Sequence, residues 1–282
     1  MEAIVTRPGE GEVLTGERRE LRVKGVHPEL LVLECAVEPG YEGPRPHFHR
    51  RHVDSFYVLD GELEFAIGGE TVRAEPGTFV LVPPGLVHSF ANPRAEPARF
   101  LNVQAPETGF VELLRERERG EEPDAQRFDV WDTDGEPRAS AAAPIVYRAG
   151  DGRRASKRVV IKAGRDEIAV TESRYEPGRR GPEPHLHRLH ADSFYVLEGE
   201  LEFLLGEEKI RAPGGTFVLA PPRFVHTFWN PGPADARYLN FHAPGVGFDE
   251  YLVSQPAEGE SEAEFLARFD HYYVDRPHPA DM

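Results

Sequence analysis

The chain has a single cysteine, no long hydrophobic run and far fewer basic than acidic residues, and each shortage excludes a class of protein. With Cys35 alone, no disulfide can form within the chain, which favours a reducing compartment such as the cytoplasm. No apolar stretch approaches the roughly 20 residues that span a bilayer, and the N-terminus carries no basic and apolar signal sequence. We therefore expect a cytoplasmic protein without a membrane anchor.

The shortage of basic residues bears on possible partners. Lys and Arg number 33 against 49 Asp and Glu, so the formal net charge is -16. Nucleic acid and anionic membrane surfaces repel an acidic protein, and we expect neither as a partner. A hydrophobic content of 39% over 282 residues is enough for a packed core in one large or two ordinary domains.

An internal repeat organises the chain. The segment PHFHRRHVDSFYVLDGEL, which begins at Pro46, returns as PHLHRLHADSFYVLEGEL from Pro184, an offset of 138 residues (184 minus 46). The same offset relates Gly77 to Gly215 without a gap, so each copy is expected to form a complete domain. The stretch 132–144 is rich in small and helix-breaking residues and is the best candidate linker, which predicts domains 1–140 and 141–282.

The periodicity within each copy is that of strands. Short β-rich segments such as SFYVL, ELEFAI and TFVLV are separated by Gly, Pro or acidic turn residues, which predicts an all-β fold. Strands so closely spaced favour a sandwich or a barrel. Helices are expected only after the strands of each copy, at 109–120 and 261–269, where apolar residues recur at helical spacing.

Histidines and an aspartate cluster at the start of the repeated segment. His47 and His49 project to the same side of a strand, and Asp54 returns to that side if the chain bulges between them. His88, beyond a hairpin, can close the cluster from a neighbouring strand. Imidazoles and a carboxylate that converge on one point suit a divalent transition metal such as Mn, Fe, Co, Ni, Cu or Zn. The second copy repeats the set as His185, His187, Asp192 and His226.

The sequence at this point resembles the cupins, over nearly the whole chain, as two tandem cupin domains or a bicupin. The first cupin motif is matched by the two histidines, the acid and Gly61 of the first copy. The second motif, Gly-x5-Pro-x-Gly-x2-His-x3-Asn, is matched by Gly77, Pro83, Gly85, His88 and Asn92. The resemblance implies two small antiparallel β-barrels of the jelly-roll (double-stranded β-helix) type, each with one metal ion held by the cluster. Exposed strand edges of tandem barrels usually pair with each other, so we also expect an intramolecular pseudo-dimer of the two domains, with or without a homodimer of chains.

Two departures from the family pattern affect the mechanism. Asp54 and Asp192 stand where the motif has Glu. The shorter carboxylate either binds the metal directly, binds it through water or only orients an imidazole. Alternatively, His52 and His190 replace the carboxylates as ligands. Arg223 stands where the first copy has Gly85. Arg223 either lies on the surface of a turn, at a modest conformational cost if that turn needs a positive φ, or places a cation at the pocket rim.

Further residues share the direction of the predicted ligands. Four phenylalanines face the pocket or, more commonly for a small barrel, fill its core. Asn240 and His242 alternate on a late strand, where the first copy has Asn102 and Gln104. The pocket candidates are Phe56, Phe90, Asn102, Phe194, Arg223, Phe228, Asn240 and His242. Three histidines lack such neighbours and are expected to have no role in a site: His27, His271 and His278.

Three functions fit this reading. The first is a metal-dependent dioxygenase, similar to the bicupin quercetinases, for a small apolar or aromatic enol or phenol, in which Asp54 and Asp192 are the candidate catalytic bases. The second is a metal-dependent decarboxylase or isomerase of a small carbonyl acid. The third is a non-catalytic small-molecule or metal-binding protein. The inward positions are mainly apolar, which favours the first.

Overall fold

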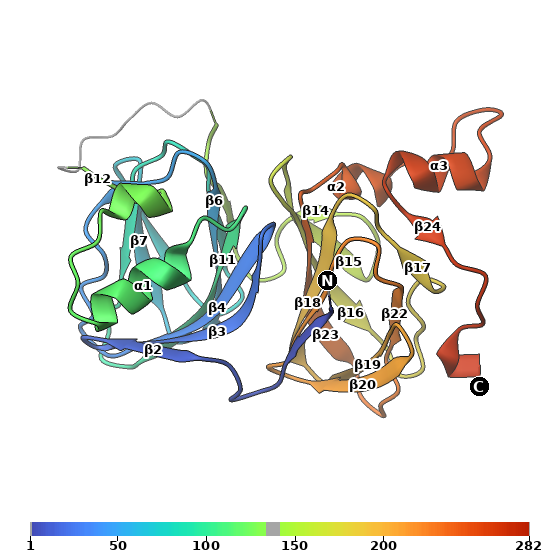
Figure 1. Ribbon diagram of the computed structural model, residues 1–282, viewed down its shortest axis with the longest axis horizontal. Coiled ribbons are helices and arrows are strands. Elements are labelled where there is room, and N and C mark those ends of the chain that lie inside the picture. Colours follow the sequence, from blue (N-terminus) through green and yellow to red (C-terminus); the bar gives the residue numbers. More distant parts are fainter. Residues whose placement is uncertain (1, 134–141, 282) are drawn as a thin grey trace. The chain divides into compact units, whose positions relative to one another are not determined.

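The structure is a computed structural model that describes residues 2–133 and 142–281 (Figure 1). The chain divides into two compact units, which we call the N-terminal unit (Gly11–Gly152) and the C-terminal unit (Met1–Glu10 with Arg153–Met282). The centre of the expected linker and the predicted boundary near residue 140 lie outside the described residues, and that boundary stays a prediction.

The N-terminal unit consists of two antiparallel sheets in the residues that the structure describes. The larger has the order β13-β9-β6-β11-β4-β3-β2 and the smaller the order β12-β5-β10-β7-β8. The strands are β2 (Val13–Gly16), β3 (Arg19–His27), β4 (Leu30–Val37), β5 (His47–Phe48), β6 (Val53–Asp60), β7 (Leu63–Ile67), β8 (Glu70–Ala74), β9 (Phe79–Val82), β10 (His88–Ala91), β11 (Ala98–Ala105), β12 (Trp131–Asp132) and β13 (Ile145–Tyr147).

The C-terminal unit repeats this plan. Its sheets have the orders β1-β21-β18-β23-β16-β15-β14 and β20-β19-β22-β17-β24. The strands are β1 (Ile4–Thr6), β14 (Arg153–Arg154), β15 (Val159–Gly164), β16 (Ala169–Tyr175), β17 (His185–Leu186), β18 (Ala191–Glu198), β19 (Glu200–Leu205), β20 (Glu208–Pro213), β21 (Phe217–Ala220), β22 (His226–Trp229), β23 (Ala236–Ala243) and β24 (Tyr272–Tyr273). The predicted all-β fold is confirmed, as a pair of sheets in each unit.

One edge strand of each larger sheet comes from the other repeat in the sequence. β1 pairs with β21 of the C-terminal unit, where Ile4 lies opposite Leu219. β13, at the start of the second repeat, pairs with β9 of the N-terminal unit, where Ile145 lies opposite Leu81. These strands cover edges that would otherwise expose unpaired backbone groups. Each larger sheet therefore includes a strand from the other repeat, and the C-terminal unit is made of two separate stretches of the sequence.

The helices follow the main strands of each unit, as predicted, but the short strands β12 and β24 come after them. They are α1 (Phe110–Glu118), α2 (Phe248–Tyr251) and α3 (Glu262–Arg268), with the 3-10 turns η1 (Ala125–Phe128) and η2 (Pro279–Asp281). Ser261 and Glu264 form a capping box that satisfies backbone N–H groups at the start of α3. Among the residues that the structure describes, no helix is long and apolar enough to cross a membrane.

Aromatic side chains fill the space between the two sheets of each unit. In the N-terminal unit the ring of Phe56, on β6, lies 4.9 Å from that of Phe65, on β7, and 5.4 Å from that of Phe90, on β10. In the C-terminal unit Phe194 lies 4.9 Å from Phe228 in the same arrangement. Burial of each such side chain contributes on the order of 2 kcal/mol. Phe56, Phe194 and Phe228 are buried members of these cores, and Phe90 is partly buried and packs against the first of them.

The turn before the second histidine motif needs a left-handed backbone in both units. Gly85 has φ 82° and Arg223 has φ 68°, and the amide of each donates a hydrogen bond to the carbonyl of His49 or His187, respectively. The arginine therefore adopts a conformation that favours glycine. The conformational cost that the sequence suggested for Arg223 is present, and its side chain is exposed.

The variant Arg223→Gly should stabilise the protein by about 0.5–1 kcal/mol, because removal of the left-handed strain exceeds the extra entropy of glycine in the unfolded chain. The midpoint of urea unfolding measures this change. The reciprocal variant Gly85→Arg should destabilise the N-terminal unit by a similar amount. A destabilised Arg223→Gly protein would show that the arginine side chain contributes more than the turn costs.

Candidate metal centre

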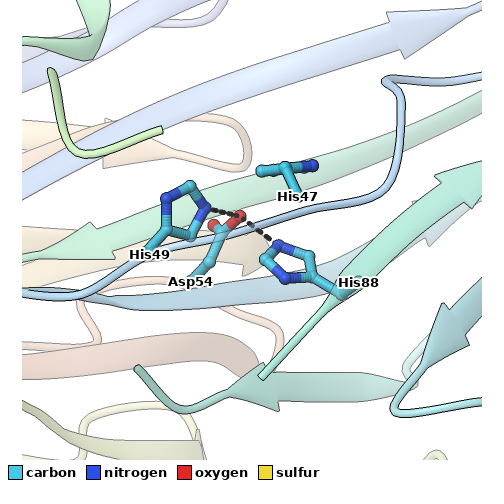
Figure 2. A group of neighbouring side chains, drawn as sticks. All are labelled: His47, His49, Asp54 and His88. Carbon is cyan, nitrogen blue, oxygen red and sulfur yellow. Dashed lines mark hydrogen bonds and ion pairs between the residues drawn. The ribbon is translucent and has the colours of Figure 1, made fainter. Parts of the chain in front are cut away.

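Four side chains of the N-terminal unit converge on one point (Figure 2). His47 lies on β5, His49 just after it, Asp54 on β6 and His88 on β10. One ligand atom from each residue lies within 4.8 Å of the other three, and all four residues are buried. Strand pairing explains the convergence, because His88 lies directly opposite His47 in the β10–β5 ladder. We call this group the N-terminal centre.

Each imidazole of the N-terminal centre is anchored through Nδ1. His47 Nδ1 lies 2.9 Å from the carbonyl oxygen of Arg45, and His88 Nδ1 lies 3.1 Å from the carbonyl oxygen of Leu86. His49 Nδ1 lies 2.8 Å from the carbonyl oxygen of Asp129. A carbonyl only accepts, so Nδ1 carries the hydrogen and Nε2 keeps its lone pair. This is the tautomer that a metal ligand needs.

The carboxylate of Asp54 is held from two sides. Its Oδ2 atom lies 3.5 Å from His49 Nε2 and 3.3 Å from His88 Nε2, and its Oδ1 atom accepts a hydrogen bond from Asn102. Burial favours a raised pKa, but the charge attraction and close polar contact of His49 and His88 outweigh it and hold the pKa of Asp54 well below its usual range. The group is therefore a carboxylate at neutral pH.

The chemistry of this donor set fits a divalent transition metal. Burial, with the neighbouring His88 and His49, lowers the pKa of His47 to about 3, so that its imidazole is neutral at physiological pH. His49 Nε2 is buried and has no hydrogen-bond partner among the described residues, although it faces the carboxylate. Neutral imidazoles and one carboxylate are the ligands of borderline divalent ions.

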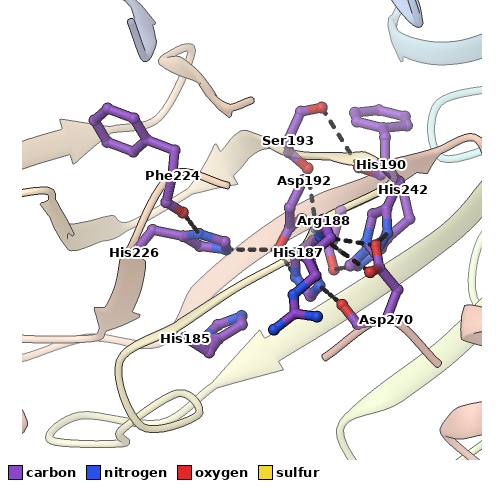
Figure 3. Close-up of polar contacts among 12 residues, drawn as sticks. His185, His187, Arg188, His190, Asp192, Ser193, Phe224, His226, His242 and Asp270 are labelled. Carbon is purple, nitrogen blue, oxygen red and sulfur yellow. Dashed lines mark hydrogen bonds and ion pairs between the residues drawn. The ribbon is translucent and has the colours of Figure 1, made fainter. Parts of the chain in front are cut away.

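The C-terminal unit contains the same arrangement (Figure 3), which we call the C-terminal centre. It consists of His185, His187, Asp192 and His226, whose ligand atoms also lie within 4.8 Å of one another. The Nδ1 atoms are anchored on carbonyl oxygens of Glu183, Asp270 and Phe224 at 2.8–2.9 Å. Asp192 lies 3.1 Å from His226 Nε2 and accepts a hydrogen bond from Asn240.

His52 and His190, the alternative ligands, lie beside the centres and outside the four-residue groups. His52 Nδ1 lies 2.9 Å from Asp129 Oδ2 and His190 Nδ1 2.8 Å from Asp270 Oδ2. Each forms a separate possible group with the second histidine of its motif. The carboxylates of Asp54 and Asp192 therefore occupy the fourth position in the arrangement.

Asp129 and Asp270 organise the loops that carry the histidines, and sequence reasoning missed both. The carboxylate of Asp129 accepts hydrogen bonds from the amides of Arg50 and Arg51, and Asp270 does the same for Arg188 and Leu189. Their backbone carbonyls anchor the second histidine of each motif. The tripeptide Arg-Phe-Asp that ends in each aspartate occurs once per copy, and this repetition was the available signal.

The C-terminal centre has further histidines around it. His242 is buried. Its Nδ1 atom lies 2.8 Å from His190 Nε2, and its Nε2 atom lies 2.9 Å from the side-chain oxygen of Asn240. His271, expected to have no such neighbours, stacks on His185 with ring centroids 4.2 Å apart. His27 and His278 lie outside both centres; His278 pairs with Thr227.

A cavity of about 1050 Å³ lies next to the N-terminal centre. His47, His49 and Asp54 line it together with an apolar wall that includes Phe56, Phe90, Phe100, Leu33 and Val37. The predicted pocket residues Phe56, Phe90 and Asn102 are thus beside the centre. Four arginines also line the cavity: Arg18, Arg19, Arg45 and Arg117, accompanied by Glu17, Glu42 and Asp132.

The corresponding positions in the C-terminal unit carry bulkier side chains. Tyr175 stands where the first repeat has Val37, and Tyr238 where it has Phe100. The Tyr175 ring stacks on Phe228 at 5.5 Å and lies edge-on to Tyr238 at 5.4 Å. Phe194 and Phe228, predicted as pocket candidates, belong to this packed aromatic cluster. The two centres therefore have different surroundings.

Comparison with known proteins assigns both halves of the chain to the same domain family. A family model described as a cupin domain matches residues 33–104 and again 171–242. Quercetin 2,3-dioxygenase of Bacillus subtilis is 24% identical over 219 residues, which cover 64% of this chain and 64% of that enzyme. The match thus spans less than two thirds of the enzyme.

Solved structures share the fold at low identity. Protein Ylba from E. coli superposes with a TM-score of 0.62 at 14% identity, over 86% of this chain and 90% of that one. Oxalate decarboxylase from Bacillus subtilis superposes with a TM-score of 0.58 at 14% identity, over 86% of this chain and 76% of that one. Likeness at this identity shows the fold alone.

The metal-free protein should lose stability steeply in acid. Burial is the largest cause that lowers the pKa of His47 and His271 to about 3 and that of His190 to about 4, whereas an unfolded histidine titrates near 6.5. Since these folded pKa values are depressed, the stabilisation is fully present above about pH 6.5 and is lost as the pH falls towards 3–4, at up to about 1.4 kcal/mol per pH unit for each histidine.

Urea midpoints of metal-free protein between pH 7 and pH 4 measure this dependence. The variant His271→Val, which copies the residue of the first repeat, should have a shallower slope by about one proton. A midpoint that does not change over this range would contradict the burial of neutral histidines.

Proposed function

This chain belongs to the cupin family, with a cupin domain in each half, and we propose that it is a metal-dependent dioxygenase of a small apolar or aromatic enol or phenol. The observation that supports this function best is the cavity of about 1050 Å³, which joins an aromatic wall to His47, His49 and Asp54. A cavity of this size accommodates a molecule of two or three rings. The likeness to quercetin 2,3-dioxygenase agrees with this substrate class.

The residues proposed to hold one metal ion in each half are the four of each centre. Each set offers three imidazoles and one carboxylate, which leaves coordination positions open for other ligands. A divalent metal held there would supply a Lewis-acidic site for a substrate oxygen. The carbonyls that accept from Nδ1 hold the rings in the orientation that this requires.

The aromatic wall would position the substrate by apolar contact. Phe90 and Phe100 lie edge-to-face at 5.2 Å on the cavity wall, and their packing against the core fixes them there. A flat apolar ring can lie against these faces with its hydroxyl directed at the histidines. The same wall would exclude water from the reacting end of the substrate.

For Asp54 we favour the role of a metal ligand over that of the catalytic base. Both of its oxygens already have neighbours, Asn102 on one and the two histidines on the other. Its pKa lies well below the usual range, so it is a weak proton acceptor at neutral pH. To act as a base it would have to leave one of these interactions when the substrate binds. The same holds for Asp192 in the C-terminal centre.

One observation favours a second candidate, a decarboxylase or isomerase of a small carbonyl acid. Arg19 has the same orientation along β3 as the core residue Leu21, lines the cavity, and among the described residues pairs with no carboxylate. A cation in this place can bind a carboxylate group. The inward-facing positions are thus less uniformly apolar than the sequence indicated.

Cellular location and assembly stay predictions from the sequence. The cytoplasm is expected because Cys35 is the chain's single cysteine. The small-molecule partner is the substrate proposed above, and a homodimer of chains remains open to a measurement of mass in solution.

Protein purified without added metal or affinity resin should contain about two equivalents of Fe, Mn, Ni, Co, Cu or Zn per chain, one per centre. His49→Ala and His187→Ala should each remove about one equivalent, because each variant destroys one set of ligands. Elemental analysis measures both. A chain that contains no metal and binds none when metal is added would contradict the proposed function.

Oxygen uptake with flavonols and β-diketones should depend on the wall of the N-terminal cavity. Phe90→Leu removes an aromatic contact worth about 1 kcal/mol and should lower kcat/KM roughly fivefold, whereas Phe228→Leu, the matched change in the C-terminal unit, should leave it unchanged. Arg19→Leu should have little effect on an uncharged substrate. Carbon dioxide release from keto acids, abolished by Arg19→Leu and without oxygen uptake, would instead establish the second candidate.

A further inference from the structure

His271 occupies the position that Val130 has in the first repeat. Asp129 and Asp270 make equivalent hydrogen bonds, and the residue after each is Val130 or His271. The next strands agree, since Asp132 of β12 lies opposite His47 and Tyr273 of β24 lies opposite His185. Val130 lines the cavity beside the N-terminal centre. His271 thus takes, beside the C-terminal centre, the position that lines the cavity in the N-terminal unit.

The polar atoms of His271 are buried without a partner. The residue is 4% exposed, and neither ring nitrogen has a hydrogen-bond partner among the described residues. Its ring lies parallel to that of His185, 4.2 Å away, and edge-on to that of His187 at 5.4 Å. Tyr251 stacks on it at 5.8 Å. A buried donor and acceptor left in this state is costly, and such groups in native proteins find a partner.

His271 is not a member of the four-residue group that could hold a metal ion. The group whose ligand atoms lie within 4.8 Å of one another contains His185, His187, Asp192 and His226 but not His271. A side chain that stacks on one ligand and lies outside the group can reach a small molecule bound at the centre. From this placement we infer that His271 is a ligand-binding residue of the C-terminal centre, where it donates a hydrogen bond to a small carboxylate bound at the metal.

This inference rests on the proposed metal centres and gives the two a different ligand preference. The ligand sets are equal in charge and residue type, so a different preference has to come from the surroundings, and this position is one of those that differ. Valine offers only apolar contact, which suits the uncharged ring proposed for the N-terminal cavity. A histidine N–H supplies a charge-assisted hydrogen bond to a carboxylate, which is among the stronger hydrogen bonds in proteins.

Formate binding to cobalt-loaded full-length variants tests the inference. His49→Ala keeps only the C-terminal centre, and His187→Ala keeps only the N-terminal one. The visible absorption of Co(II) reports formate binding at the remaining centre. We expect the C-terminal centre to bind formate at least tenfold more tightly than the N-terminal one. In the His49→Ala background, His271→Val should remove this advantage, whereas His271→Gln, which keeps an N–H donor, should retain part of it.

The cobalt content separates the inference from its premise. If neither single-centre variant holds about one cobalt per chain, the metal centres fail and the inference with them. If cobalt is present but formate binds equally with His271, valine or glutamine, the inference alone is overturned, and His271 has a packing role or pairs with water. Should His271→Val not fold, the comparison of the two single-centre variants and the glutamine variant still decides the result.

Discussion

The hydrogen bond from histidine Nδ1 to a backbone carbonyl is the interaction on which both centres depend. It occurs at every histidine of the two four-residue groups, at 2.8–3.1 Å. It selects the tautomer, turns the ring and leaves Nε2 directed at the carboxylate. Two of the three carbonyls in each centre are local to the histidine they anchor. The third, from Asp129 or Asp270, is about 80 residues away, so the centre needs the complete unit.

Asp129 and Asp270 join two otherwise separate parts of each unit. Their carboxylates bind the backbone amides of the loop after the His-x-His motif, and also His52 or His190. Both residues have a positive φ, 61° and 59°, which turns the carbonyl and the carboxylate towards the same loop. This strained conformation is accepted where several hydrogen bonds depend on it. The segment after the barrel strands thereby belongs to the centre as much as the strands do.

The two repeats keep the centre and differ around it. Where the N-terminal unit has a cavity bounded by Phe100, Val37 and Val130, the C-terminal unit places Tyr238, Tyr175 and His271. The ligands are fixed by backbone hydrogen bonds within the strands and loops, whereas a wall residue can change without disturbing them. Divergence of the walls around equal centres is the physical basis on which we propose different ligand preferences for the two sites. The exchanged edge strands β1 and β13 pair with β21 and β9, which carry none of the residues of the two centres.

Much of this molecule could be predicted from its sequence, because the decisive signals are local. Strand alternation placed His47 and His49 on one side, the offset of 138 residues revealed the two domains, and the missing glycine at Arg223 indicated a strained turn. The grouping of Asp54 with the three histidines, the contacts of Asp129 and the environment of His271 were decided only by the tertiary structure. These depend on loop paths and on contacts between residues far apart in the chain, and a side chain's partner at that distance leaves no periodic trace in the sequence.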